Sequence, residues 1–147
     1  MARYLVGVDF RTGPDESPMS DWTPEEVQAH LDYYGELNDE LTTTGELVGH
    51  TILTGPDLAM IVSSDGRSAP VVTDGPFQEF KEWLAGFQII DVETPERAIE
   101  IAALVSAVPG RGGVPTAQPI HLRRIMDDAP TDVAEMTAFL RTAGTSI

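Results

Sequence analysis

The chain has 147 residues, of which 41% are hydrophobic and 22% are charged. This is enough apolar material for one domain with a core, and too little for two ordinary domains. The net charge of −15 disfavours binding to nucleic acid or to an anionic membrane, and the lack of cysteine excludes disulfides and thiolate chemistry. With no leader peptide and no long apolar run in view, we expect a soluble, acidic, cytoplasmic protein.

A strand and a long capped helix are predicted first. Apolar residues alternate over 4–10, which predicts a strand inside a sheet. After a surface loop over 11–21, Thr23 and Glu26 have the spacing of a capping box. The apolar residues that follow lie on one helical stripe until Gly45, a residue type that favours the position just after a helix.

The middle of the chain predicts short strands joined by turns. The runs 47–53, 58–63 and 71–73 are rich in the β-branched residues that strands favour. The Asp-Gly pair at 65–66 is a strong hairpin signal between the last two runs. A further strand is predicted over 86–92.

Two more helices and a last strand complete the chain. Thr94 is placed to cap a helix that begins at Pro95, and the Gly-rich segment 109–115 is interpreted as a connector. The run 120–126 predicts the last strand. Asp132 can then cap a C-terminal helix.

This order of elements predicts an α+β fold. A strand–helix–strand unit that occurs twice matches the ferredoxin-like βαββαβ arrangement, with a mainly antiparallel sheet and both helices on one face. The other face also needs cover, from a second copy related by two-fold symmetry or from the C-terminal helix. We therefore expect one domain over 1–126 and a C-terminal helical extension over 127–147.

The segment 74–87 carries a recognisable motif. It begins Asp74-Gly75-Pro76-Phe77 and resembles the D-G-P-F-x-E-x-K-E-x-L-x-G signature of YCII-related, DGPF-domain proteins. The likeness extends over about residues 3–126. It implies a homodimeric α/β barrel of ferredoxin-like subunits, which agrees with the topology predicted from the residues.

The resemblance implies little about activity. Some relatives have been proposed as enzymes that use a His–Asp pair, and genes for DGPF proteins often lie beside genes for extracytoplasmic-function sigma factors. The chain departs from the family pattern in its long loop at 11–21 and in the residues beyond about 127. Either segment could reshape or cover a site.

His30 and Asp74 are the candidate catalytic residues. His30 lies inside the apolar stripe of the first helix, and His30-Leu31 resembles a His-Leu segment in the first helix of YciI-like relatives. Asp74 could orient the ring and raise the pKa of His30, so that the pair acts as general acid and base. The structural alternatives are a hydrogen-bonded core histidine and an Asp74 carboxylate that caps the turn.

Other polar and aromatic residues are candidates for ligand binding. His121 and Arg123 share a face of the last strand, and an arginine there could hold a carboxylate with two hydrogen bonds. A solvated rim, an exposed ion pair and core packing are the alternatives. Neither a metal site nor a cofactor is expected, because the histidines lie in separate elements. The candidate ligand-binding residues are His50, Lys81, Phe87, His121 and Arg123.

The leading hypothesis is a dimer with a small-molecule pocket between the first helix and the sheet. His30 and Asp74 would lie at its polar end and move a proton on a small organic substrate. The competing hypothesis is a non-catalytic module that senses a ligand or binds a protein, linked to a sigma-factor pathway. Under neither hypothesis do we expect nucleic acid or a membrane as a partner.

Overall fold

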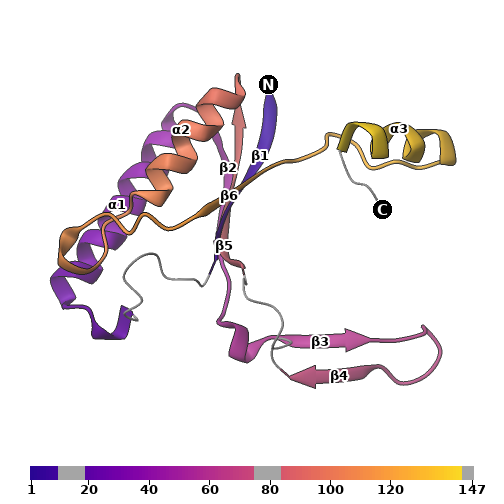
Figure 1. The fold of residues 1–147 in the computed structure, drawn as a ribbon, viewed down its shortest axis with the longest axis horizontal. Coiled ribbons are helices and arrows are strands. Elements are labelled where there is room, and N and C mark those ends of the chain that lie inside the picture. The colour runs from indigo at the N-terminus through magenta and orange to yellow at the C-terminus, as the bar shows by residue number, and fades with distance from the viewer. Residues whose placement is uncertain (10–18, 75–83, 144–147) are drawn as a thin grey trace.

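The computed structural model describes residues 1–9, 19–74 and 84–143 of the chain. Figure 1 shows two long helices against a sheet, with a hairpin and a third helix on the other side. Short 3₁₀ turns lie at Met19–Asp21, Pro56–Leu58 and Arg111–Gly113. The strands and α-helices are β1 (Ala2–Asp9), α1 (Pro24–Thr43), β2 (Leu47–Ile52), β3 (Met60–Ser63), β4 (Val71–Asp74), β5 (Leu84–Val92), α2 (Pro95–Ser106), β6 (Ile120–Arg124) and α3 (Val133–Ala143).

The main sheet has four strands in the order β2-β5-β1-β6, and each neighbouring pair is antiparallel. The two connections that contain α1 and α2 each cross to a strand that is not adjacent in the sheet, which is the split βαβ pattern. The α+β, ferredoxin-like fold predicted from the sequence is therefore confirmed. Both helices lie on the same face of the sheet (Figure 1).

Local capping signals set the helix ends as the sequence predicts. The Thr23 side chain accepts the N–H of Glu26, and the Glu26 carboxylate accepts the N–H of Thr23, so the capping box is complete. Gly45 follows α1 with a φ of +80°, a backbone conformation that costs glycine little. Asp132 accepts the N–H of Glu135 at the start of α3.

The core lies between the two helices and one face of the sheet. Val6, Leu41, Ile90 and Ile101 are fully buried there. Each such side chain contributes about 1.5–3 kcal/mol when it leaves water. Because side chains alternate along a strand, the residues next to the buried ones on β1 and β5 point to the opposite face, which neither α1 nor α2 covers (Figure 1).

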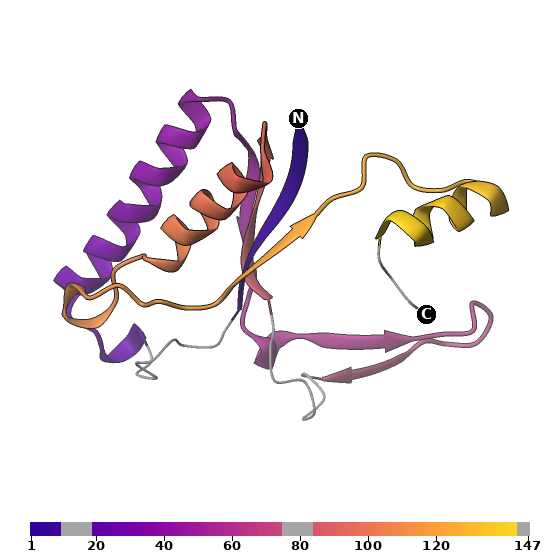
Figure 2. The same cartoon turned by 45° about the horizontal axis from the view of Figure 1, so that its top comes forward.

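The β3–β4 hairpin does not join the main sheet. Its strands pair only with each other, as a separate two-stranded sheet, so the predicted strands are present but extend away from the domain body. Figures 1 and 2 show the hairpin and α3 both reaching out on the side of the sheet away from α1 and α2. The helix-free face is therefore flanked by two projecting segments.

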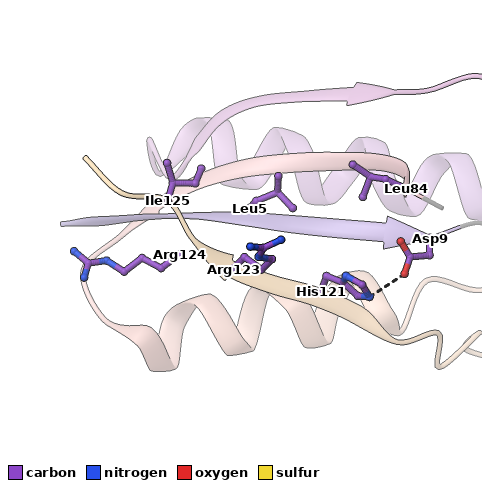
Figure 3. Close-up of a pocket in the computed structure, with 7 residues that line it drawn as sticks. All are labelled: Leu5, Asp9, Leu84, His121, Arg123, Arg124 and Ile125. Carbon is purple, nitrogen blue, oxygen red and sulfur yellow. Dashed lines mark ion pairs between the residues drawn. The ribbon is translucent and has the colours of Figure 1, made fainter. Parts of the chain in front are cut away.

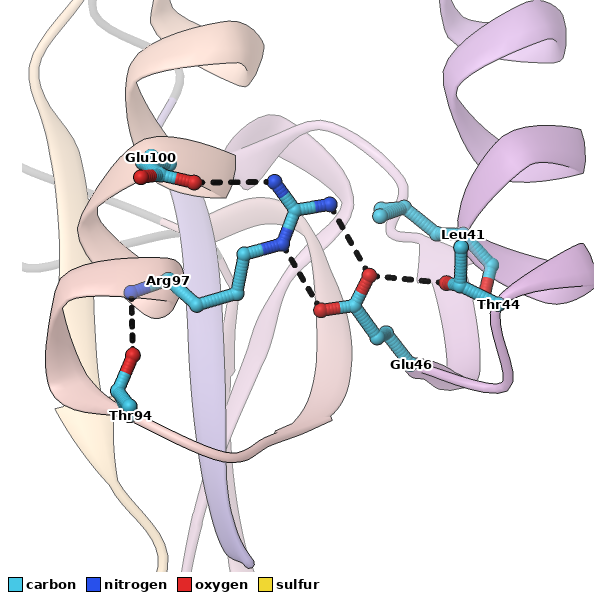
Figure 4. Close-up of polar contacts among 6 residues, drawn as sticks. All are labelled: Leu41, Thr44, Glu46, Thr94, Arg97 and Glu100. Atoms are coloured by element: carbon cyan, nitrogen blue, oxygen red, sulfur yellow. Dashed lines mark hydrogen bonds and ion pairs between the residues drawn. The ribbon is translucent and has the colours of Figure 1, made fainter.

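A carboxylate–guanidinium pair ties both helices to the sheet (Figure 4). Arg97 on α2 donates from Nε to Glu46 Oε2 at 2.9 Å and from Nη2 to Glu46 Oε1 at 3.0 Å. Glu46 follows α1 directly, and its backbone carbonyl accepts the N–H of Asp91 on β5. The Glu46 side chain is only 16% exposed, so water screens the pair weakly.

We predict that Glu46→Gln lowers the free energy of unfolding at pH 7 by about 1–2 kcal/mol, because it removes a charge-assisted pair. The hydrogen bonds from Arg97 hold the pKa of Glu46 below its usual range. A lowered carboxyl pKa gives stability that is present above the unfolded-state value of about 4.3 and is lost as the pH falls through the folded-state value. Urea denaturation should show that the difference in the free energy of unfolding between wild type and variant is smaller in acid than at pH 7.

Glu100→Gln is the matched control. Glu100 also meets Arg97, at 3.1 Å, but its side chain is 64% exposed. Exposed pairs contribute about 0.2–1 kcal/mol, so this variant should stay close to wild type. Equal losses at pH 7 in the two variants would contradict a special role for Glu46.

Candidate functional site

A cleft of about 380 Å³ lies on the helix-free face of the sheet. It is formed by β1, β6 and the start of β5, and it combines apolar walls with charged groups (Figure 3). The lining residues are Leu5, Asp9, Leu84, His121, Arg123, Arg124 and Ile125.

Strand register brings the polar residues of this cleft together. Gly7 pairs with His121 and Leu5 with Arg123, so the side chains of His121 and Arg123 lie on the face that β1 shares with Asp9. Asp9 is then a diagonal neighbour of His121 across the two strands. A register shift in the β1–β5 pairing places Leu84 opposite Asp9.

Gly7 forms the floor between the apolar wall and the histidine. A Cβ at this position would lie 3.0 Å from Leu84 Cδ1, 3.1 Å from Leu5 Cδ2 and 3.5 Å from His121 Cβ. The two approaches to the leucine side chains are tighter than ordinary van der Waals contact, so a larger residue at this position would require Leu5 and Leu84 to shift.

The polar side chains of the cleft include a His121–Asp9 pair and the neighbouring guanidinium of Arg123. His121 Nε2 lies 2.9 Å from Asp9 Oδ2, and the side chains of His121 and Asp9 are 43% and 9% exposed. A buried carboxylate against one ring nitrogen orients the imidazole. With Arg123 and Arg124 beside the single carboxylate of Asp9, the cleft is locally positive in a chain whose net charge is −15.

The structure does not bring His30 and Asp74 together. The His30 ring donates from Nδ1 to the carbonyl of Pro109 at 2.8 Å and packs edge-on against Trp22 and Tyr34. Asp74 lies at the end of β4 in the projecting hairpin. No hydrogen bond or ion pair joins the two side chains, both of which are described. His30 is thus a part-buried histidine with a backbone partner.

The predicted ligand-binding residues separate into groups. His121 and Arg123 line the cleft. Phe87 pairs with Gly7, so it lies on the same face one strand away, whereas His50 pairs with Gln88 and shares its helix-covered face. Lys81, like the D-G-P-F motif beyond Asp74, lies outside the described residues. Over 1–9, 19–74 and 84–143, no cluster of acidic residues and histidines could hold a metal ion.

Asp9 is the residue that sequence reasoning missed. Its signal was present, because a ferredoxin-like topology sets the first and last strands side by side and antiparallel. Alternation then puts Asp9 and His121 on the same face of neighbouring strands. The predicted pocket between α1 and the sheet is instead filled by buried side chains such as Leu37 and Leu41.

The fold and the cleft define a ferredoxin-like α+β domain with a polar cleft on its helix-free sheet face. A model of the YCII-related domain matches residues 12–114, and the chain belongs to this family. The chain is 31% identical over 99 residues to an uncharacterized protein of Rhizobium meliloti (strain 1021), covering 67% of this chain and 79% of that protein.

The family match covers only part of the cleft, because Leu84 lies inside the matched residues. Asp9 and His121 lie just outside the matched residues, at the two ends of the domain. Within the described residues, no helix is both long and apolar enough to span a membrane.

We predict that two histidine substitutions change the stability of the protein by different amounts. His30→Ala should lower the free energy of unfolding by about 1–3 kcal/mol, because the part-buried Pro109 carbonyl loses its donor. His121→Ala should change it by no more than about 0.5–1 kcal/mol, since the ring is exposed. Chemical denaturation of both variants checks this, and a larger loss in His121→Ala would contradict the assignment.

Proposed function

We propose that the chain binds a small organic anion in the β1–β6 cleft and that His121 and Asp9 exchange a proton with it. The observation that carries this proposal is the 2.9 Å pair of His121 and Asp9 beside Arg123 in a cleft of about 380 Å³. Its volume lies at the small end of the range for ligand sites.

The preference for an anion follows from the local charge. Arg123 presents a planar guanidinium that can hold a carboxylate with two parallel hydrogen bonds. No side chain in the described part of the chain forms an ion pair with it. The acidic surface elsewhere repels anions, so electrostatic attraction of a small carboxylate is strongest at the positive cleft.

The proton chemistry follows from the pair. Histidine is the side chain that most often serves as a general acid or base, and Asp9 at 2.9 Å orients its ring. A substrate carboxylate on Arg123 would set a neighbouring C–H bond toward the ring. His121 would accept that proton while the electron pair moves onto the adjacent carbonyl oxygen to form an enolate, and return of the proton to the same carbon would complete an exchange or an inversion at that carbon.

Binding is tested with small carboxylates such as pyruvate and benzoate, each compared with its neutral amide. We predict that carboxylates shift the melting temperature of the wild type and that Arg123→Gln weakens binding about tenfold or more, because one charged partner is lost. Arg141→Gln is the matched control, since Arg141 lies on α3. Equal binding by both variants, or no preference for carboxylate over amide, would reject the proposal.

Proton transfer is tested separately. Wild-type protein in D₂O should speed exchange of the C–H beside the carbonyl of a bound keto acid, followed by NMR. Asp9→Asn should slow this exchange about 100-fold while leaving the binding constant within a few-fold, because general acid–base catalysis contributes about 10²–10⁴-fold. If the wild type binds the keto acid but does not speed the exchange, the catalytic step is rejected and the chain only binds the ligand.

A further inference from the structure

Polar and apolar side chains of the cleft lie on different strands. His121 and Arg123 are both on β6, whereas Leu5 is on β1 and Leu84 begins β5. Figure 3 shows the two leucines on one side of the cleft and the histidine and the arginine on the other. Because β1 lies between β5 and β6 in the sheet, the cleft has an apolar half and a polar half.

The two leucines form one continuous apolar wall. A Cβ built on Gly7 would lie 3.0 Å from Leu84 Cδ1 and 3.1 Å from Leu5 Cδ2, so the two side chains converge above this glycine. The same point lies 3.5 Å from His121 Cβ. Since glycine places no side chain between them, the apolar wall reaches the base of the histidine side chain.

The wall continues across β5 and is not fully covered by the chain itself. Phe87 pairs with Gly7 and Ile89 pairs with Leu5, so both lie on the cleft face of β5. Both side chains are partly exposed, as are Leu5 and Leu84. Aliphatic and aromatic side chains of this size are usually buried, so an apolar group on the ligand would remove this surface from water.

Charge is distributed unevenly over the two halves. Among the residues that line the cleft, the arginines are Arg123 and Arg124, and both belong to β6. Asp9 pairs with Leu84 in the strand register, so the apolar half has a carboxylate at its edge. A second anionic group placed in that half would meet a like charge and apolar side chains that cannot replace its water.

We propose that the ligand of this cleft is an α-keto monocarboxylate with an unbranched apolar chain. Its carboxylate contacts Arg123, and the carbon beside its carbonyl faces His121. The rest of the chain crosses β1 and covers Leu5 and Leu84. This inference rests on the proposed function, because it names the class of anion that the same cleft takes.

The first test compares three α-keto acids with the unmodified full chain by isothermal titration calorimetry. α-Ketocaproate is expected to bind at least about tenfold more tightly than pyruvate, because burial of a single methylene is worth about fourfold in affinity. α-Ketoadipate has as many carbon atoms as α-ketocaproate but ends in a second carboxylate. It is expected to bind at least about tenfold more weakly than α-ketocaproate.

The possible results separate this inference from the function on which it rests. Similar affinities for all three keto acids would overturn the apolar preference and leave the proposed function standing. Tightest binding of α-ketoadipate would show that a cation, not the leucine wall, holds the far end of the ligand, which also overturns the inference. If none of the three binds, the proposed function and this inference fail together.

Two substitutions locate the apolar half of the cleft. Leu84→Ala and Leu5→Ala each remove part of the wall, so each should reduce the preference for α-ketocaproate over pyruvate at least about fivefold. Leu104→Ala is the matched control, because Leu104 is 40% exposed on α2, which covers the other face of the sheet. This control should keep the preference of the wild type.

Far-UV circular dichroism and the melting temperature without ligand show whether each variant is folded. The two leucines come from different strands, so one folded variant is enough for the comparison, and the ligand series with the unmodified chain depends on neither. A folded Leu84→Ala or Leu5→Ala protein that keeps the preference of the wild type would place the apolar chain elsewhere and overturn the inference.

Discussion

Burial of one face of the β2-β5-β1-β6 sheet against α1 and α2 is the constraint on which the rest of this structure depends. Val6 and Ile90 have no exposed surface, so every alternate residue on their strands must point to the opposite face. Apolar packing thus leaves that second face as the place where polar side chains can stay near solvent. The cleft lies on this second face because core side chains and the two helices occupy the first.

The contrast between His30 and His121 shows how position decides the role of a histidine. His30 on α1 has one carbonyl partner and two aromatic neighbours, so its ring stabilises the junction between α1 and the segment after α2. His121 faces a buried carboxylate on a surface with room for a ligand. The same side chain is a packing element in the first setting and a candidate proton carrier in the second.

The chain combines a family domain with features that lie at or beyond its edges. The match to the YCII-related domain covers residues 12–114, whereas Asp9, His121 and α3 lie outside it. The first and last strands of the chain build the cleft together with the start of β5. The cleft is therefore built on strands of the packed sheet itself, whereas the hairpin lies between two of those strands in sequence and pairs outside the sheet.

The sequence by itself determined the helices, their caps and most strands, because those signals are local: Thr23 with Glu26, Gly45 and Asp132 each act within a few residues. Alternation also separated the two faces of each strand. Only the tertiary structure decided which side chains meet across the strands. It joined Asp9 to His121, and it sent the hairpin of Asp74 away from α1 and His30. Strand pairing between distant segments depends on the packing of the whole core, which no local pattern encodes.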